Sequence, residues 1–284
     1  MGRFSFSGHE SFFCKPLWLK KGYDALASGV DLSSPDAVVH LGVGKNMVSS
    51  IKFWMRAFGL SVDKEPTELA KALFDTESGW DPFLEDTGTL WLLHYYLVKN
   101  GIASIYNLSF LGLQREKREF DRQQLQSFIK RKCSVPQQSN TYNENTVRKD
   151  IGVFLHNYVS PSDTKSLEDY SAIFLDLGLI KCTGTAGVYA FSEIPPSDIH
   201  PLILLHALLD YKGEDNTISL DLMQDLSLIF CLGIPGFIEI VKELVSAFPD
   251  NLAYTDNSGI KNIHFMGHLD SMQILNQYYK HDEI

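Results

Sequence analysis

Residues 39–54 of the chain read VHLGVGKNMVSSIKFW, and this stretch decides between two kinds of fold. Its Gly-Val-Gly-Lys run could be a glycine-rich loop that holds a nucleotide phosphate. A Walker loop needs a glycine five places before the Gly-Lys pair and a Ser or Thr after it, but those places hold Val39 and Asn46. A dinucleotide-binding loop needs a third glycine where Met47 stands. We therefore expect no nucleotide cofactor.

The same stretch fits a helix-turn-helix, in which a tight turn joins two short helices. An apolar helix over residues 37–41 runs into Gly42, and the glycines supply the sharp turn. A second helix follows, with an apolar series at Val48, Ile51, Met55 and Phe58. Because the steps of this series are 3, 4 and 3 residues, it lies on one helical face.

The opposite face of the second helix carries side chains of the kind that contact DNA phosphates and base edges. These are Lys45, Asn46, Ser49, Ser50 and Lys52, with Arg56 one turn further on. The unit could also be an ordinary helical hairpin with a solvated polar face, because such a motif reports a geometry and not a function. The sequence thus predicts a recognition helix for DNA, with a structural or protein-binding hairpin as the alternative.

Charge is unevenly distributed along the chain, whose net charge is −10. Residues 1–150 carry 19 Lys and Arg against 17 Asp and Glu, a balance of +2. Residues 151–284 carry 6 against 18, a balance of −12. Since nucleic acids bind basic surfaces, we expect DNA on the N-terminal half and a protein partner on the acidic half.

A second unit of the same kind is predicted where the N-terminal half is most basic. Residues 121–132, 143–159 and 166–178 read as helices, and residues 179–193 read as two strands around a Gly-rich turn, the form of a wing. The second of these helices has a buried stripe at Val147, Ile151, Phe154, Leu155 and Tyr158. The expected DNA contacts are Arg115, Arg118, Arg122, Arg148 and Lys149. A solvated charged helix face is the alternative.

A third unit is predicted in the acidic half, with helices over 221–233, 235–248 and 270–279 and a hairpin over 251–265. The proline-rich stretch 195–202 lacks periodicity and marks the boundary before it. The sequence thus predicts a mainly α protein with short β-hairpins, built from tandem winged-helix or helix-turn-helix units. Three domains are expected: an N-terminal helical domain over 1–112, a basic winged-helix-like domain over 113–194 and an acidic one over 195–284.

The cysteines and the apolar runs bear on where the protein works. Cys14, Cys133, Cys182 and Cys231 lie too far apart for a zinc or redox motif, so we expect them to be buried apolar residues in a reducing compartment. No apolar run reaches membrane-spanning length, and residues 1–13 lack the pattern of a signal peptide. We expect a cytoplasmic protein without membrane contact.

Several blocks of the sequence carry a family resemblance. SGHESFFCKPLWLKKGYDAL, LGVGKNMVSSIKFWMRAFGL and DPFLEDTGTLWLLHYYL, with the later TVRKDIGVFLHNYV and NSGIKNIHF, resemble the signature blocks of the bacterial domain-of-unknown-function family 4007. The resemblance implies a component of DNA phosphorothioate modification and phage-defence clusters. It implies partners there: a cysteine desulfurase, a sulfur-transferring ATP pyrophosphatase and an ATPase. It also implies DNA nicking in a single-strand phosphorothioation system, without assigning catalytic residues.

Cleavage of a phosphodiester generally needs a metal ion held by carboxylates, or a positioned nucleophile, together with a cation that stabilises the developing charge. The candidates form two groups: His9, Glu10 and Lys15 near the N-terminus, and Asp86 with its neighbours Asp81, Glu85 and His94. Mg²⁺ or Mn²⁺ is the expected cofactor, although neither spacing is a nuclease motif and the metal ligands stay unassigned.

Each of these two groups has a structural alternative. Ser7 and Glu10 fit a capping box at the start of a helix. The run Asp86-Thr87-Gly88 also fits a helix start, and Asp81-Pro82 fits a turn. His94 falls on the apolar stretch LWLLHYYL and is expected in the core.

Two functions from different classes remain open at this point. In the first, the protein is an endonuclease that nicks DNA and so gives the sulfur-transfer proteins access to the backbone. In the second, it is a non-catalytic winged-helix module, an adaptor or a transcriptional regulator of the system. The family resemblance favours the first function, and the missing nuclease spacing favours the second.

Overall fold

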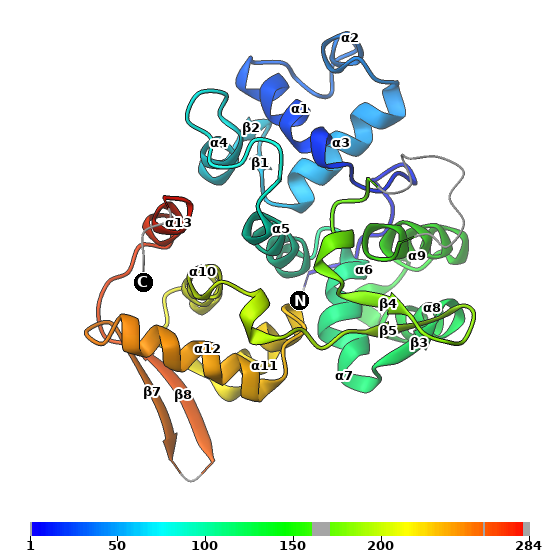
Figure 1. Ribbon diagram of the computed structural model, residues 1–284. Helices are drawn as coiled ribbons and strands as arrows, with labels where there is room; N and C mark the ends of the chain where they lie inside the picture. Colours follow the sequence, from blue (N-terminus) through cyan, green and yellow to red (C-terminus); the bar gives the residue numbers. More distant parts are fainter. Residues whose placement is uncertain (1, 161–170, 258, 281–284) are drawn as a thin grey trace. The chain divides into compact units, whose positions relative to one another are not determined.

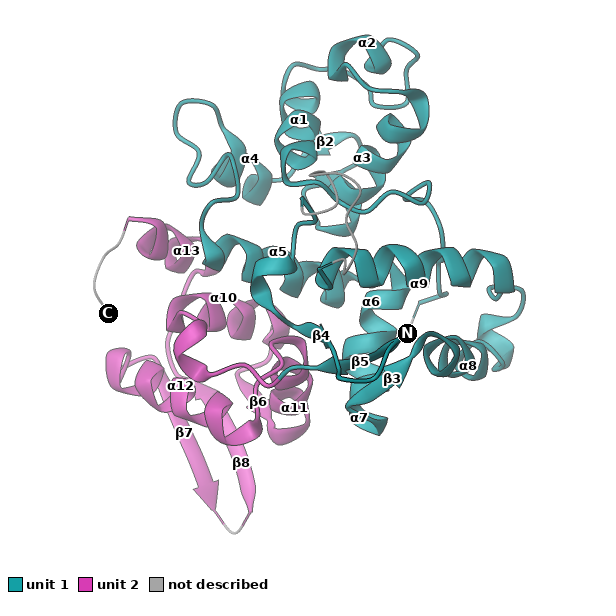
Figure 2. Ribbon diagram, turned by 45° about the vertical axis from the view of Figure 1, so that its right-hand side comes forward, with its two compact units in different colours: residues 1–192 teal, residues 193–284 magenta. Residues whose placement is uncertain are grey.

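The computed structural model describes residues 2–160, 171–257 and 259–280 and divides into two compact units, residues 1–192 and 193–284 (Figure 2). The division lies two residues before the boundary expected between 194 and 195. The boundary expected after residue 112 falls inside the first unit. Both units consist of helices with small antiparallel sheets, as the sequence predicts (Figure 1).

The first unit begins with a group of short helices and a two-stranded hairpin. Its elements are α1 (Pro16–Ala27), α2 (Ala37–Leu41), α3 (Lys45–Ala57), β1 (Ser61–Val62), β2 (Glu65–Pro66) and α4 (Glu68–Phe74). Gly42 ends α2 with a φ of 63°, in the left-handed region that glycine adopts at little cost. Gly44 is extended and immediately precedes α3. The two predicted helices are therefore present, and Gly42 makes the turn between them.

The rest of the first unit contains longer helices around a three-stranded sheet. Its elements are α5 (Thr87–Asn100), α6 (Ser104–Asn107), the π-helical η1 (Leu108–Leu113), α7 (Gln114–Glu116), β3 (Glu119–Asp121), α8 (Arg122–Lys132), η2 (Pro136–Gln138), α9 (Glu144–Tyr158), η4 (Leu175–Leu177), β4 (Ile180–Cys182) and β5 (Val188–Phe191). The strand order is β3-β5-β4. The helix expected over 166–178 is absent from the part of it that is described, residues 171–178, which contains a 3₁₀ turn; residues 166–170 lie outside the described residues.

The second unit repeats the arrangement of helices around a small sheet. Its elements are η5 (Pro196–Asp198), α10 (Pro201–Lys212), β6 (Thr217–Ser219), α11 (Leu220–Ile229), α12 (Ile234–Ala247), β7 (Leu252–Asn257), β8 (Ile260–Phe265) and α13 (Ser271–Tyr279). The strand order is β6-β8-β7, again antiparallel. The predicted helices and hairpin of this part are confirmed, and the β7–β8 hairpin projects from the unit (Figure 1).

The largest fully buried side chains of the first unit are aromatic. The predicted buried faces of α3 and α9 are confirmed, since every member of both apolar series is at most 4% exposed. His94 is fully buried, as expected, and its Nδ1 lies 2.8 Å from the Tyr158 hydroxyl. Rings of Phe110, Tyr158 and Phe174 surround it. This cluster packs α5 against η1 and α9.

The cysteines follow the prediction with one exception. Cys14, Cys133 and Cys231 are buried, and burial raises the pKa of the Cys14 and Cys133 thiols. Cys182 is exposed, because it lies at the end of the edge strand β4. Across the described ranges, no helix is long and apolar enough to cross a membrane.

The cap of α9 provides a test of this fold. The Asn143 side chain accepts a hydrogen bond of 3.0 Å from the Thr146 backbone N–H at the helix start. We expect Asn143→Ala to lower the free energy of unfolding by ~1 kcal/mol, since that N–H loses its partner. The matched control is Asn145→Ala, two residues on, where the side chain accepts from the exposed Arg148. Equal losses in urea unfolding of the two variants would contradict the capping role.

Candidate nucleic-acid interface

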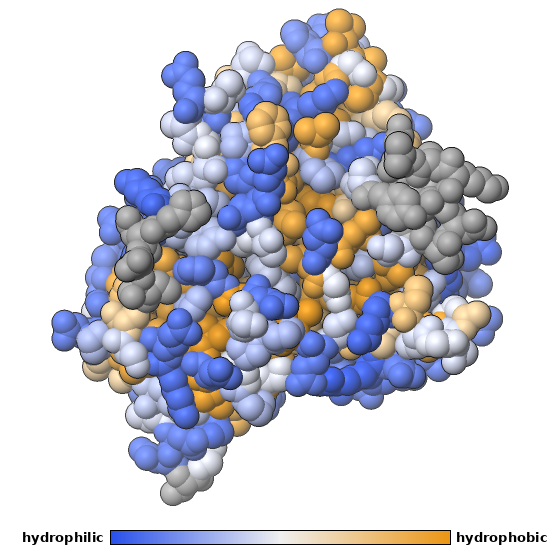
Figure 3. Space-filling view, in the orientation of Figure 1, coloured by the Kyte–Doolittle hydropathy of each residue, from blue (hydrophilic) through white to orange (hydrophobic). Residues whose placement is uncertain are grey.

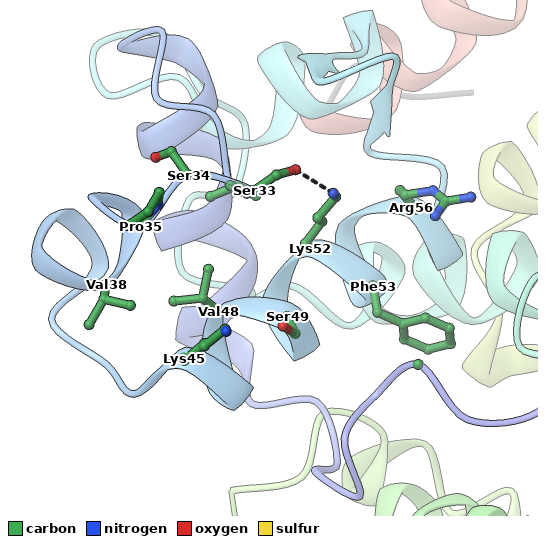
Figure 4. Close-up of a pocket in the computed structure, with 12 residues that line it drawn as sticks. Ser33, Ser34, Pro35, Val38, Lys45, Val48, Ser49, Lys52, Phe53 and Arg56 are labelled. Carbon is green, nitrogen blue, oxygen red and sulfur yellow. Dashed lines mark hydrogen bonds between the residues drawn. The ribbon is translucent and has the colours of Figure 1, made fainter.

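A groove of about 610 Å³ follows the exposed side of α3 (Figure 4). Residues from α2, α3, the loop before α2 and the N-terminal segment line it: Gly8, Leu32, Ser33, Ser34, Pro35, Val38, Lys45, Val48, Ser49, Lys52, Phe53 and Arg56. Three of these side chains are cationic, and none of them is a carboxylate. The groove therefore offers positive charge and hydroxyl groups on a partly apolar floor.

The three cations of the groove stand along one side of α3. The Lys52 ammonium donates a 2.6 Å hydrogen bond to Ser33 Oγ (Figure 4). Lys45 and Arg56 are exposed and make no hydrogen bond or ion pair with any described residue. Asn46 and Ser49 are exposed as well. These five side chains therefore lie where the sequence predicts a contact surface.

Ser50 is a correction to that surface. It is fully buried, and its hydroxyl has no hydrogen-bond partner among the described residues. The cause is that both α1 and α5 pack on α3, so the buried face of the helix is wider than its apolar stripe. Ser50 therefore cannot contact DNA from this position.

The apolar part of the groove comes from the short helix α2. Val38 lines the groove and Val39 beside it is 82% exposed. Figure 3 shows hydrophobic colour over α2 at the top of the view. The side of the groove that α2 forms is therefore apolar.

A second basic surface lies on α7, α8, α9 and the turn between α7 and β3. Its expected members Arg115, Arg118, Arg122, Arg148 and Lys149 are all exposed. Arg122 and Lys149 make no hydrogen bond or ion pair with a described residue, while Arg148 donates to Asn145 at 3.3 Å. Two other bases of this region, Arg131 and Lys132, pair with Glu116. Arg122, Arg148 and Lys149 thus keep their charge available to an anion.

The N-terminal segment joins the two basic surfaces through a buried pair, His9 and Asp150. His9 Nδ1 accepts from the Ser11 backbone N–H, so its Nε2 carries the proton and donates to Asp150 Oδ1 at 3.1 Å. The Asp150 carboxylate also accepts from the Ser7 N–H, at 2.9 Å. On its other side, the His9 ring stacks on Trp54 of α3. One side chain therefore contacts both α3 and α9.

Gly8 allows this segment to approach α3 closely. Its φ is 99°, and a Cβ there would lie 2.5 Å from Cδ2 of Phe53. An L-residue would be strained in this conformation and would also displace the Phe53 ring, which lines the groove. The glycine thus fits the segment against the groove.

The structure places the catalytic candidates in different surroundings. His9 is buried in the pair described above, whereas Glu10 is exposed. The Lys15 ammonium lies 5.9 Å from the Phe13 ring centre, immediately before α1. Asp86 accepts a 3.2 Å hydrogen bond from the Thr89 N–H at the start of α5. Among the described residues, no three His, Cys, Asp or Glu side chains gather closely enough to hold a metal ion.

Three of the four structural alternatives are confirmed, including the buried position of His94, and one is wrong. Asp86 caps α5, and Asp81 accepts from the backbone N–H groups of Glu85 and Asp86 in a turn. The capping box of Ser7 and Glu10 is not formed, because no helix starts there and α1 begins at Pro16. The backbone instead turns through positive φ at Ser7, Gly8, Glu10 and Ser11.

The sequence interpretation missed Asp150, which is 3% exposed. A signal was available, since Asp150 lies three residues after Val147 and four before Phe154 and therefore falls on the buried stripe of α9. A carboxylate at such a position needs a buried partner. The groove residues Ser33 and Ser34 carried no comparable signal.

A comparison with protein families now adds to this geometry. The sequence profile of the family described as "Protein of unknown function (DUF4007)" matches residues 6–279. The chain belongs to the DUF4007 family. This confirms the family expected from the sequence blocks.

Solved structures resemble this DUF4007 chain over nearly its whole length. A structure described as "Magnesium ion-bound SspB crystal structure" is 27% identical with a TM-score of 0.84, and covers 97% of this chain and 88% of that one. A second, described as "SspB crystal structure", is 26% identical with a TM-score of 0.80 and the same coverage. No curated protein matches the chain. The fold of this chain is thus similar to that of SspB.

Asp86 of this DUF4007 protein can be tested for a role beyond capping. Asp86→Ala should lower the free energy of unfolding by ~1 kcal/mol, whereas Asp86→Asn should keep it, since an asparagine caps a helix as well as an aspartate. Thermal unfolding measures both. If the Asp86 carboxylate is catalytic, both variants should lose DNA cleavage, because neither keeps the carboxylate. DNA cleavage that survives in Asp86→Asn would show that Asp86 only caps the helix.

Proposed function

We propose that this chain is a DNA-binding component of a bacterial DNA phosphorothioate modification and defence system, in which it nicks DNA and so opens the backbone to sulfur incorporation. The observation that carries DNA binding is the groove on α3, which is lined by three cations and by no carboxylate among the described residues. The assignment to a phosphorothioation system rests on the family resemblance and on the likeness to SspB.

The order of elements supports a winged-helix interpretation of two segments, 104–191 and 201–265. Each runs helix, strand, two helices and a hairpin, and in each the first strand pairs with the last. In winged-helix DNA readers the second helix of the pair enters the major groove. Here those helices are α9 and α12. The exposed bases of α9 suit DNA, whereas α12 exposes Glu239, Lys242 and Glu243.

We therefore assign DNA to α3 and α9 and a protein partner to the second unit. Residues 193–284 carry 14 Asp and Glu against 4 Lys, so this unit repels a polyanion. A partner with a basic surface suits it, and the cysteine desulfurase, ATP pyrophosphatase and ATPase of the system are the candidates. The partner and the DNA would then bind different units of the same chain.

Contacts within the DNA surface divide by their chemistry. Lys45, Lys52, Arg56, Arg148 and Lys149 suit phosphates, and so do Arg115, Arg118 and Arg122. Asn46 and Ser49 stand in the first turns of α3, where amide and hydroxyl groups suit base edges. Sequence preference would then arise mainly from the start of α3.

Nicking assigns a role to Glu10, which is exposed two residues from Gly8 of the groove. Mg²⁺ commonly binds one or two carboxylates together with phosphates of the substrate, and Mn²⁺ accepts similar ligands. Glu10 fits the role of one such ligand. Because no group of three potential ligands occurs among the described residues, we derive no metal-dependent step.

An adaptor or transcriptional regulator without catalysis is the second candidate function. The observation that favours it is the separation of His9, Lys15 and Asp86, each of which has a structural role where it stands: a buried pair, the residue before α1 and a helix cap. DNA binding is common to both functions, and a nicking assay separates them.

DNA binding predicts a strong dependence of affinity on salt. For about five to seven phosphate contacts, the plot of the logarithm of the association constant against the logarithm of salt concentration should have a slope of about −5. Arg148→Ala should weaken all DNA sequences alike and reduce the slope by about one. Fluorescence anisotropy across a salt series measures this, with Lys242→Ala in the acidic unit as the control. Equal effects of the two substitutions would contradict the assigned surface.

Nicking predicts conversion of supercoiled plasmid to open circles by the purified protein with Mg²⁺ or Mn²⁺. Glu10→Ala should remove this activity and keep the salt slope and the thermal stability, because Glu10 is exposed and caps no helix. The control is Glu77→Ala, another exposed glutamate. Absence of nicking by the wild type, with DNA binding intact, would favour the adaptor.

A further inference from the structure

A second pocket, of about 500 Å³, shares the lining residue Arg56 with the α3 groove. It is lined by Gly2, Arg3, Phe4, Ser5, Arg56, Lys99, Asn100, Gly101, Ile102, Ser104 and Asn107. Three of these side chains are cationic, and no carboxylate occurs among them. In a unit with as many acids as bases, 21 of each over residues 1–192, this exclusion of carboxylates marks a surface for an anion.

Buried polar contacts fix the N-terminal residues that build this pocket. The side chain of Gln138, which is 4% exposed, accepts from the Phe4 N–H at 2.7 Å and donates to the Gly2 carbonyl at 3.0 Å. Ser5 and Ser104 exchange two further hydrogen bonds. The backbone on both sides of Arg3 is therefore held in place.

The Arg3 guanidinium uses one of its N–H groups in a hydrogen bond within the protein. One of its terminal nitrogens donates to the Ser139 carbonyl at 2.9 Å. A guanidinium carries five N–H donors in a rigid fork, so most of them stay available for a phosphate. Arg3 also precedes residues 6–279, which match the family profile. One of the three cations that line the pocket, Arg3, therefore lies outside the residues that match the family profile.

Arg56 connects this pocket to the groove of α3, because its side chain lines both. It makes no hydrogen bond or ion pair with a described residue. A ligand that occupies both spaces must carry anionic groups in succession, which is the chemistry of a nucleic-acid backbone. A single free phosphate would satisfy one space and leave the cations of the other unused.

We propose that the pocket of Arg3, Arg56 and Lys99 binds a phosphodiester of the DNA strand that leaves the α3 groove, so that the two spaces form one continuous strand path past Arg56. The proposal rests on the proposed DNA-binding function and adds the direction in which the DNA strand runs across the surface. Free inorganic phosphate is the other source of the same chemistry, and the experiment separates the two.

The test is the salt dependence of DNA affinity for Arg3→Ala in the full chain, measured by fluorescence anisotropy. Loss of one phosphate contact should reduce the log-log slope by about 0.9 and weaken binding of every sequence alike. The matched control is Arg131→Ala, an exposed arginine that already pairs with Glu116 and should leave the slope unchanged. Because Arg3 is exposed, its substitution should preserve the fold, which thermal unfolding checks.

A second variant keeps the test independent of the Arg3 side chain. Gln138→Ala removes both contacts that hold residues 2 and 4 and should also reduce the slope. In the double variant with Arg3→Ala the loss should be no greater than in Arg3→Ala alone, since Gln138 is a positioning residue that acts through Arg3. If the double variant reduces the slope by the sum of the two single reductions, Gln138 does not act through Arg3, and the proposed strand path is overturned.

Two further outcomes separate failure of the path from failure of DNA binding. If Lys45→Ala and Arg148→Ala reduce the slope and Arg3→Ala does not, the DNA function stands and the strand path is overturned. If calorimetry with inorganic phosphate shows binding to the wild type that Arg3→Ala loses, while the DNA slope is unchanged, the pocket belongs to a free phosphate and the path is again overturned. Absence of any salt dependence in the wild type would overturn both proposals.

Discussion

The buried carboxylate of Asp150 is the constraint on which the candidate interface depends. A buried charge is costly unless hydrogen bonds compensate it, and Asp150 receives them from the Ser7 N–H and from His9. The His9 ring in turn stacks on Trp54. The N-terminal segment, α3 and α9 therefore meet around one buried carboxylate and the His9 ring. Removal of the carboxylate would leave two donors without an acceptor, so α3 and α9 would lose a shared anchor.

The helices that carry the interface could be predicted because their signals are local. The apolar steps of α3 and α9 and the left-handed turn at Gly42 follow from residues three or four places apart. Segments whose conformation depends on distant partners could not be predicted. Ser7 and Glu10 match a capping box in sequence, but Asp150, more than 140 residues away, holds Ser7 in a turn without a helix. The spacing of residues within the N-terminal segment gives no indication of the contact with Asp150.

The same limit explains which site residues were found. Exposed bases on an amphipathic helix can be read from periodicity, so Lys45, Lys52 and Arg148 were predicted where they stand. Ser50 was misplaced because α1 and α5 both cover α3, and the number of neighbours of a helix is a tertiary property. Arg3 gave no signal, since its position depends on Gln138. Charge pattern therefore predicts a surface, and tertiary contacts decide its outline.

The backbone around Glu10 depends on the contacts of Asp150 and His9. Ser7, Glu10 and Ser11 adopt positive φ, a conformation that costs non-glycine residues about 1 kcal/mol or more each. The bonds to Asp150 and the stacking of His9 offset that cost, so the turn persists although no helix or sheet requires it. Its conformation places Glu10 in solvent, two residues from the groove. Asp86 stands under a local constraint, the cap of α5, whereas the turn that carries Glu10 depends on contacts of Ser7 and His9 with distant residues.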